Sequence, residues 1–204
     1  MARQAWGRTG DMRRLLATEA ARLLAEDEAS DYLQAKRKAA ERYGVSERDG
    51  GFPTNTEIEA ALVEHQRLFQ GDSQPNELRR LREAAVQAMK LFRDYSPRLA
   101  GPVLSGTANA NSGVQVHLFS DSPELVVMFL IDHEIPFDTR EHRFRDGNGE
   151  QFTVPEYRFL AGDVRIDAAV FPETAIRRAP LSPVDGKPMQ RAALKDVEQL
   201  LDGD

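Results

Sequence analysis

The spacing of apolar residues changes at Ser96-Pro97, and this change constrains the fold more than any other feature of the sequence. Before it, apolar residues recur at steps of three and four, as on one face of a helix. After it, β-branched and aromatic residues alternate with polar ones, as in half-buried strands. The sequence therefore predicts a loose tail at residues 1–10, a helical N-terminal region over residues 11–96, and an α/β domain with a mixed sheet and flanking helices over residues 97–204.

Local signals predict where the helices of the N-terminal region begin and end. Residues 11–43 are rich in strong helix formers, and Gly44 follows them where a C-terminal glycine cap is expected. Thr54 and Glu57 have the spacing of a capping box at the start of the next helix. A third long helix is expected from about residue 76 to residue 95, where Ser96-Pro97 stops it.

The second region begins with the stretch from Arg98 to Asp121, which reads as a strand, a turn of small residues and a second strand. Ser122 and Pro123 are typical of a helix start, because serine caps helices and proline suits their first turn. Two strands, expected at residues 152–160 and 164–171, are joined by a short turn. This arrangement predicts an antiparallel hairpin.

Composition excludes several classes of function. The chain has no cysteine, which rules out disulfides, thiolate nucleophiles and cysteine metal sites. Its formal net charge of -6 gives no support for nucleic acid as the main partner. No apolar run approaches the roughly 20 residues of a membrane span, so no membrane association is expected. The N-terminus lacks an apolar signal core, and a cytoplasmic location is the default expectation.

One basic cluster leaves two interpretations open. It consists of Lys36, Arg37, Lys38 and Arg42. These side chains could contact a phosphate or a nucleic acid. They could equally form a solvated helix face balanced by Asp31 and Glu41, which is the commoner situation for charged residues on helices.

Candidate site residues come from two segments of the α/β domain. Ser105, Gly106 and Thr107 form a small-residue turn, whose backbone amides could bind phosphate oxygens without any basic side chain. His117 lies on the strand that follows, and Asp167 lies in a strand otherwise made largely of apolar residues. We expect His117 and Asp167 to face this turn, where they could take part in acid–base chemistry.

Both candidates also have structural interpretations. A histidine on a strand face is commonly a hydrogen-bonded, half-buried residue. A carboxylate in an apolar strand needs a partner, because an unpaired buried charge is costly. Arg158 on the neighbouring strand could supply that partner, and so could Arg165 on the same strand and face. Asp167 is therefore either a site residue or one half of a structural ion pair.

The order of these elements resembles the nucleotidyltransferase superfamily of the polymerase beta type. In that family a Gly-Ser turn cradles the nucleotide phosphates, and an Asp-x-Asp pair and a third carboxylate from a later strand hold divalent metal. Ser105-Gly106 matches the turn in inverted order, and Asp167 lies where the third carboxylate would be. Gln115 and His117 stand in place of the Asp-x-Asp pair. The chain also resembles nucleotidyltransferase-like proteins of bacteria.

The resemblance implies a divergent nucleotidyltransferase-like protein that binds a nucleotide or another phosphate ligand, with Gln115 added to the binding residues. A glutamine amide and a neutral imidazole are poor ligands for Mg²⁺, so the usual two-metal site is not expected. One alternative is an active enzyme in which His117, Asp167 and Gln115 hold another divalent metal, such as zinc or manganese. Another is a protein-interaction module without enzymatic activity.

Overall fold

The chain divides into two compact units. The computed structural model describes residues 2–26, 28–29, 31–46, 51–69, 74–109 and 112–203. Unit 1 comprises Met1–Asp72 and Pro183–Asp185, and unit 2 comprises Ser73–Ser182 and Gly186–Asp204. The division thus falls before the last helix of the N-terminal region, and not after it as the change of spacing at residue 96 predicted.

Unit 1 is built from α1 (Ala2–Ala25), α2 (Tyr32–Tyr43) and α3 (Asn55–Phe69), which pack around a core of alanine and leucine side chains. Helix α1 already begins at Ala2, so the structure has helix where the sequence predicted a loose tail. Most of this segment consists of residues that support helix, such as Ala, Gln and Arg, and its two glycines do not interrupt it.

Two local predictions in unit 1 are confirmed. Gly44 caps α2 in the left-handed conformation, with φ 64°, and its N–H donates to the carbonyls of Ala40 and Glu41. The capping box is also present. The backbone N–H of Thr54 donates to Glu57 Oε2 at 2.7 Å, and the N–H of Glu57 donates to Thr54 Oγ1 at 3.2 Å.

The basic cluster has other partners than the sequence suggested. Arg42 pairs with Glu19 of α1 at 2.7 Å, and Lys38 donates to the backbone carbonyl of Glu28. Asp31 is the N-cap of α2 rather than a counter-ion of the cluster. Two of the four basic side chains are thus engaged within unit 1, as in a solvated helix face with local ion pairs.

Unit 2 contains a mixed five-stranded sheet, which confirms the predicted α/β fold. Its strands are β1 (Arg98–Ala100), β2 (Val114–Phe119), β3 (Asp138–Arg145), β4 (Gln151–Ala161) and β5 (Val164–Phe171). They follow the order β1-β2-β5-β4-β3, and only β2 and β5 run parallel. The hairpin of β4 and β5 is the predicted one.

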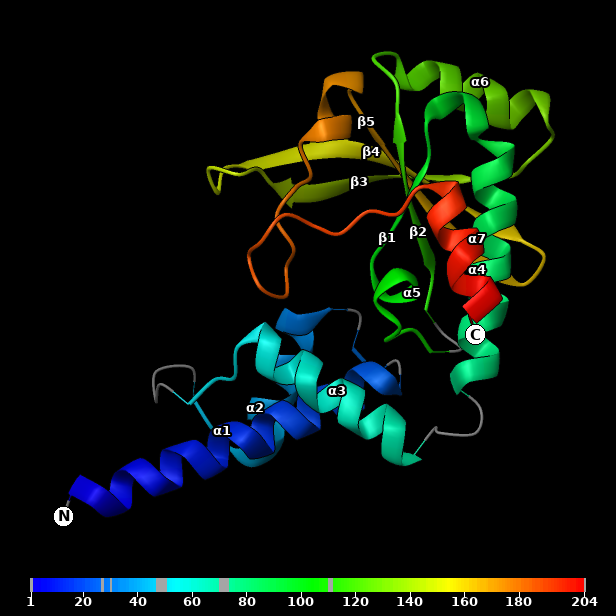
Figure 1. Cartoon of the computed structure of the whole chain (residues 1–204). Coiled ribbons are helices and arrows are strands. Elements are labelled where there is room, and N and C mark those ends of the chain that lie inside the picture. Colours follow the sequence, from blue (N-terminus) through cyan, green and yellow to red (C-terminus); the bar gives the residue numbers. More distant parts are fainter. Residues whose placement is uncertain are drawn as a thin grey trace. The chain divides into compact units, whose positions relative to one another are not determined.

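One face of this sheet carries the core of unit 2. Helices α4 (Gln74–Leu91), α6 (Pro123–Asp132) and α7 (Leu194–Gly203) lie on the same side of the sheet (Figure 1). The apolar face of α4 buries Leu81, Ala85 and Met89 in that core. Because this face is buried against the sheet, α4 belongs to unit 2. The boundary between the two units therefore lies before α4. Within the described residues, no helix is both long and apolar enough to cross a membrane.

The connections between these elements complete unit 2. Short 3₁₀ helices, η2 (Arg93–Tyr95) and η3 (Glu173–Arg177), follow α4 and β5. Pro123 opens α6 as predicted, and Ser122 occupies the N-cap position without donating or accepting a side-chain capping hydrogen bond. Between β1 and β2 the chain forms a single helical turn, α5 (Pro102–Ser105), where the sequence predicted strand and turn only. Gly101, with φ 72°, and Pro102 at the first helical position explain this turn.

Candidate functional site

The candidate residues of β2 and β5 lie on one face of the sheet. Gln115 is the register partner of Asp167, and His117 is the register partner of Ala169. Because alternate residues of a strand share a face, Gln115, His117 and Asp167 all lie opposite the face that carries Val116 and the helices. We call their side of the sheet the polar face. The two predicted catalytic residues share this face, but each has its own set of partners.

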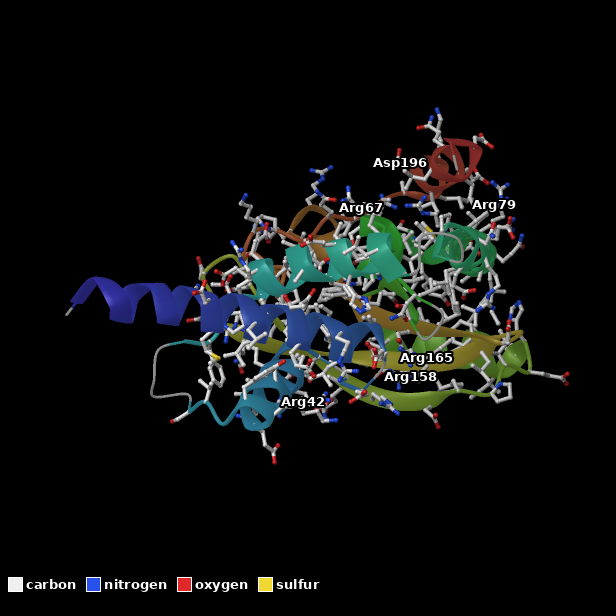
Figure 2. The ribbon with its side chains drawn as sticks, turned by 90° about the horizontal axis from the view of Figure 1, so that it is seen from below. Arg42, Arg67, Arg79, Arg158, Arg165 and Asp196 are labelled. Carbon is white, nitrogen blue, oxygen red and sulfur yellow. The ribbon has the colours of Figure 1, made fainter. Side chains whose placement is uncertain are left out.

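Two arginines hold Asp167. Arg158 Nε lies 2.5 Å from Asp167 Oδ1, and Arg165 Nε lies 3.2 Å from Asp167 Oδ2. Figure 2 shows these two arginines close together on β4 and β5. Asp167 is 7% exposed, whereas the Arg165 side chain is 42% exposed. The ion pair that the sequence suggested with Arg158 is therefore present, and Arg165 is a second arginine on the same carboxylate. We call Gln115, Arg158, Arg165 and Asp167 the arginine cluster.

Two glycines leave room for this cluster. A Cβ atom on Gly113 would lie 2.6 Å from both Arg165 Nε and Asp167 Oδ2. A Cβ on Gly101, whose φ is positive, would clash with Gln115 Oε1. Either contact would force the side chains to move, so Gln115, Arg165 and Asp167 occupy space that glycine leaves open.

Gly113→Ala is expected to displace both Arg165 and the buried Asp167 carboxylate and to destabilise the protein by about 1–3 kcal/mol, because Arg165 can move toward solvent but Asp167 cannot. The displacement should appear as a changed Nε–H resonance of Arg165 in NMR spectra. Gly147→Ala is the matched control, because nothing lies within 4 Å of its added Cβ. An unchanged Arg165 resonance in Gly113→Ala would show that the close approach described here is wrong.

The backbone N–H groups of residues 105–107 already donate hydrogen bonds to backbone carbonyls. The N–H of Ser105 donates to the carbonyl of Gly101 at 3.0 Å, and those of Gly106 and Thr107 donate to the carbonyl of Pro102 at 2.9 and 3.0 Å. The hydroxyls of Ser105 and Thr107 lie 3.0 Å apart and bond to each other. These bonds close the helical turn of α5. They remove the physical basis on which the sequence predicted phosphate binding by the amides at residues 105–107.

His117 is a buried hydrogen-bond acceptor. It is 1% exposed, and its Nδ1 accepts from Arg191 Nε at 2.9 Å. The rings of Phe171 and Phe144 lie 4.6 and 5.6 Å from its own. Burial, with the charges of Arg191 and His142, lowers the pKa of His117 to about 3. The imidazole is thus neutral and enclosed, and its catalytic role stays a prediction. Sequence reasoning missed its partner, because the two residues are 74 positions apart and no spacing rule joins them.

The polar face also holds a carboxylate–imidazole pair that sequence reasoning did not find. His142 Nδ1 and Glu156 Oε2 are 2.8 Å apart, with Glu156 buried and His142 partly exposed. Burial raises the pKa of Glu156, but the hydrogen bond and charge of His142, together with the charges of Arg158 and Arg140, outweigh burial and lower the pKa overall. The alternation of residues along β3 and β4 could have placed both on one face. Their register, however, is decided by the tertiary pairing.

A divalent metal does not fit the donor set of the arginine cluster. Both carboxylate oxygens of Asp167 accept from guanidinium groups, and Gln115 contributes only a neutral amide. No group of three or more His, Asp or Glu side chains suitable for a metal occurs in the described parts of the chain. Hard cations need several charged or carbonyl oxygens directed at one point. The arginine cluster therefore does not offer the ligands that a divalent metal requires.

Comparison with known proteins adds no family, since no family model matches the chain and no curated protein matches it. Any functional assignment consequently rests on the chemistry of the polar face. That chemistry is cationic around Asp167 and offers guanidinium and amide donors rather than nucleophiles.

Proposed function

We propose that unit 2 is a divergent nucleotidyltransferase-like domain that binds a nucleotide or another phosphate-bearing ligand through the arginine cluster, without the usual two-metal carboxylate site. The observation that supports this most is that Arg158 and Arg165 share the single carboxylate of Asp167. A partly exposed guanidinium beside a shared carboxylate is a suitable donor for an anion. Guanidinium groups match the geometry of phosphate oxygens and bind them in bidentate fashion.

The other members of the cluster have complementary roles in this proposal. Asp167 pairs with both guanidinium groups and so offsets part of their positive charge. Arg165 is the more exposed of the two and makes the first contact with phosphate. Gln115, the register partner of Asp167 on β2, adds a neutral amide donor.

The test is calorimetric titration of the full chain with ATP, ADP and inorganic phosphate in the presence of EDTA. The wild type is expected to bind at least one of these ligands without metal. Arg165→Gln should weaken that binding by about tenfold, because it removes a charge-assisted bidentate contact. Stability should change little, since the Arg158–Asp167 pair remains. Arg79→Gln is the matched control, as it removes an exposed arginine of α4 that pairs with Glu83.

Three results would contradict the proposal. Absence of any nucleotide or phosphate response in the wild type favours an interaction module. Binding that appears only with a divalent metal favours an enzyme with altered ligands. Equal losses of affinity in Arg165→Gln and Arg79→Gln would mean that the anions bind through the general positive charge of the surface and not at the arginine cluster.

A further inference from the structure

A second pair of arginines lies on the polar face, at the β1 side. Arg98 is the register partner of His117 and so projects on the same face as His117. Ala192, in the segment before α7, forms a bridge with Leu99, and each N–H donates to the other carbonyl at 2.9 Å. This bridge puts the neighbouring residue, Arg191, on the side of the sheet opposite Leu99, which is the side of Arg98.

Arg191 is held firmly but is not fully satisfied. Its Nε donates to His117 Nδ1, and its Nη1 donates to the carbonyl of Ala175 at 3.0 Å. The guanidinium carbon lies 5.1 and 4.9 Å from the ring centroids of Phe119 and Phe171. Its Nη2 is buried and has no hydrogen-bond partner among the residues that the structure describes. One donor of a rigidly positioned guanidinium therefore lacks an acceptor, an arrangement that is costly unless a ligand supplies one.

Neither arginine has a carboxylate partner within the part of the chain that the structure describes. Arg98 donates to the backbone carbonyls of Ser96 and Pro97, and Arg191 to groups that carry no charge. Burial, together with the positive charge of Arg98, lowers the pKa of Arg191 to about 10. Two positive charges that repel each other at a partly buried place, without a counter-ion, raise the free energy of the folded protein.

We propose that Arg98 and Arg191 form an anion-binding site that takes a phosphoryl group. Two unneutralised positive charges match the charge of a phosphate dianion, whereas a single carboxylate would leave one of them uncompensated. Phosphate also supplies several acceptor oxygens, one of which would satisfy Arg191 Nη2. This site shares no residue with the arginine cluster and does not depend on the proposed function.

The test is a titration of the isotopically labelled full chain with inorganic phosphate at constant ionic strength, followed through the arginine Nε–H resonances. Saturable shifts are expected at Arg98 and Arg191, with an accompanying shift of the His117 imidazole. Arg98→Met should weaken phosphate binding by about tenfold at this site. This variant leaves the contacts of Arg191 with His117 and Ala175 in place. Arg93→Met, at a side chain 79% exposed, is the control and should bind as the wild type does.

The resonances separate the possible outcomes. Shifts confined to Arg158 and Arg165 would overturn this proposal while supporting the arginine cluster. Shifts at Arg98 and Arg191 alone would support this site and would contradict phosphate binding by the arginine cluster. Equal affinity for acetate and phosphate would overturn the assignment to a phosphoryl group. If Arg98→Met does not fold, Arg191→Lys is measured instead, and wild-type affinity in that variant would equally contradict the site.

Discussion

Lowering the pH from about 7 to about 4 is expected to destabilise unit 2 by on the order of 3 kcal/mol through His117 alone. The pKa of this residue is about 3 in the folded protein and 6.5 in its unperturbed state. Between these values the unfolded chain binds a proton that the folded chain does not bind. The contribution of His117 to stability is therefore full above about pH 6.5 and is lost as the pH falls toward about 3.

The physical reason lies in the surroundings of the ring. Protonation would place a charge at a buried position, beside Arg191, and would convert Nδ1 from an acceptor into a donor facing another donor. His117→Gln keeps an acceptor oxygen for Arg191 and removes the titration. Hydrogen exchange of the β2 and β5 amides, measured in both proteins across this pH range, reports the stability of unit 2. Other titrating groups are common to both proteins, so parallel pH profiles would contradict the assignment.

Asp167→Asn is expected to have two effects of opposite sign. It should destabilise the protein by about 2 kcal/mol, because two guanidinium groups lose their shared counter-charge. This loss of stability is smaller than for a fully buried ion pair, because the side chains of Arg158 and Arg165 are 25% and 42% exposed and water screens their charges. At the same time the arginine cluster gains one unit of positive charge. Phosphate affinity should therefore rise, by a factor of about three to ten.

The second effect distinguishes an anion site from a metal site. If Asp167 were a metal-binding or catalytic carboxylate, asparagine would abolish metal-dependent stabilisation and would not strengthen phosphate binding. Thermal unfolding and phosphate titration of the same preparations give both quantities. Asp163→Asn is the control. This carboxylate lies in the turn between β4 and β5, pairs with Arg80 of α4 and is 86% exposed. Weaker phosphate binding in Asp167→Asn than in the wild type would contradict the proposed function.

Features that depend on neighbouring residues were predictable from the sequence. The capping box of Thr54 and Glu57 and the glycine cap at Gly44 were expected and are present. Strand β5 spans the predicted residues, since its apolar run ends at clear turn signals on either side. Arg158 was named as a partner of Asp167 because adjacent strands of a short hairpin have few possible registers. Such features need only the few residues around them.

Features that depend on distant residues were not predictable. The apolar face of α4 could have covered either the other helices or the sheet, and its spacing is the same in both cases. The amides of the turn at residues 105–107 looked available until the helical turn of α5 used them. His117 looked like a site residue because its sequence neighbours do not reveal Arg191, Phe144 or Phe171.

The sequence by itself determined the types of most elements, the ends of several of them and the alternation of side chains along the strands. These follow from backbone preferences and from hydrophobic spacing within short windows. Only the tertiary structure decided the strand order, the place of α4 and the partners of the charged side chains. Charge pairing and burial depend on which surfaces meet, and surfaces from distant segments meet only when the whole unit has folded.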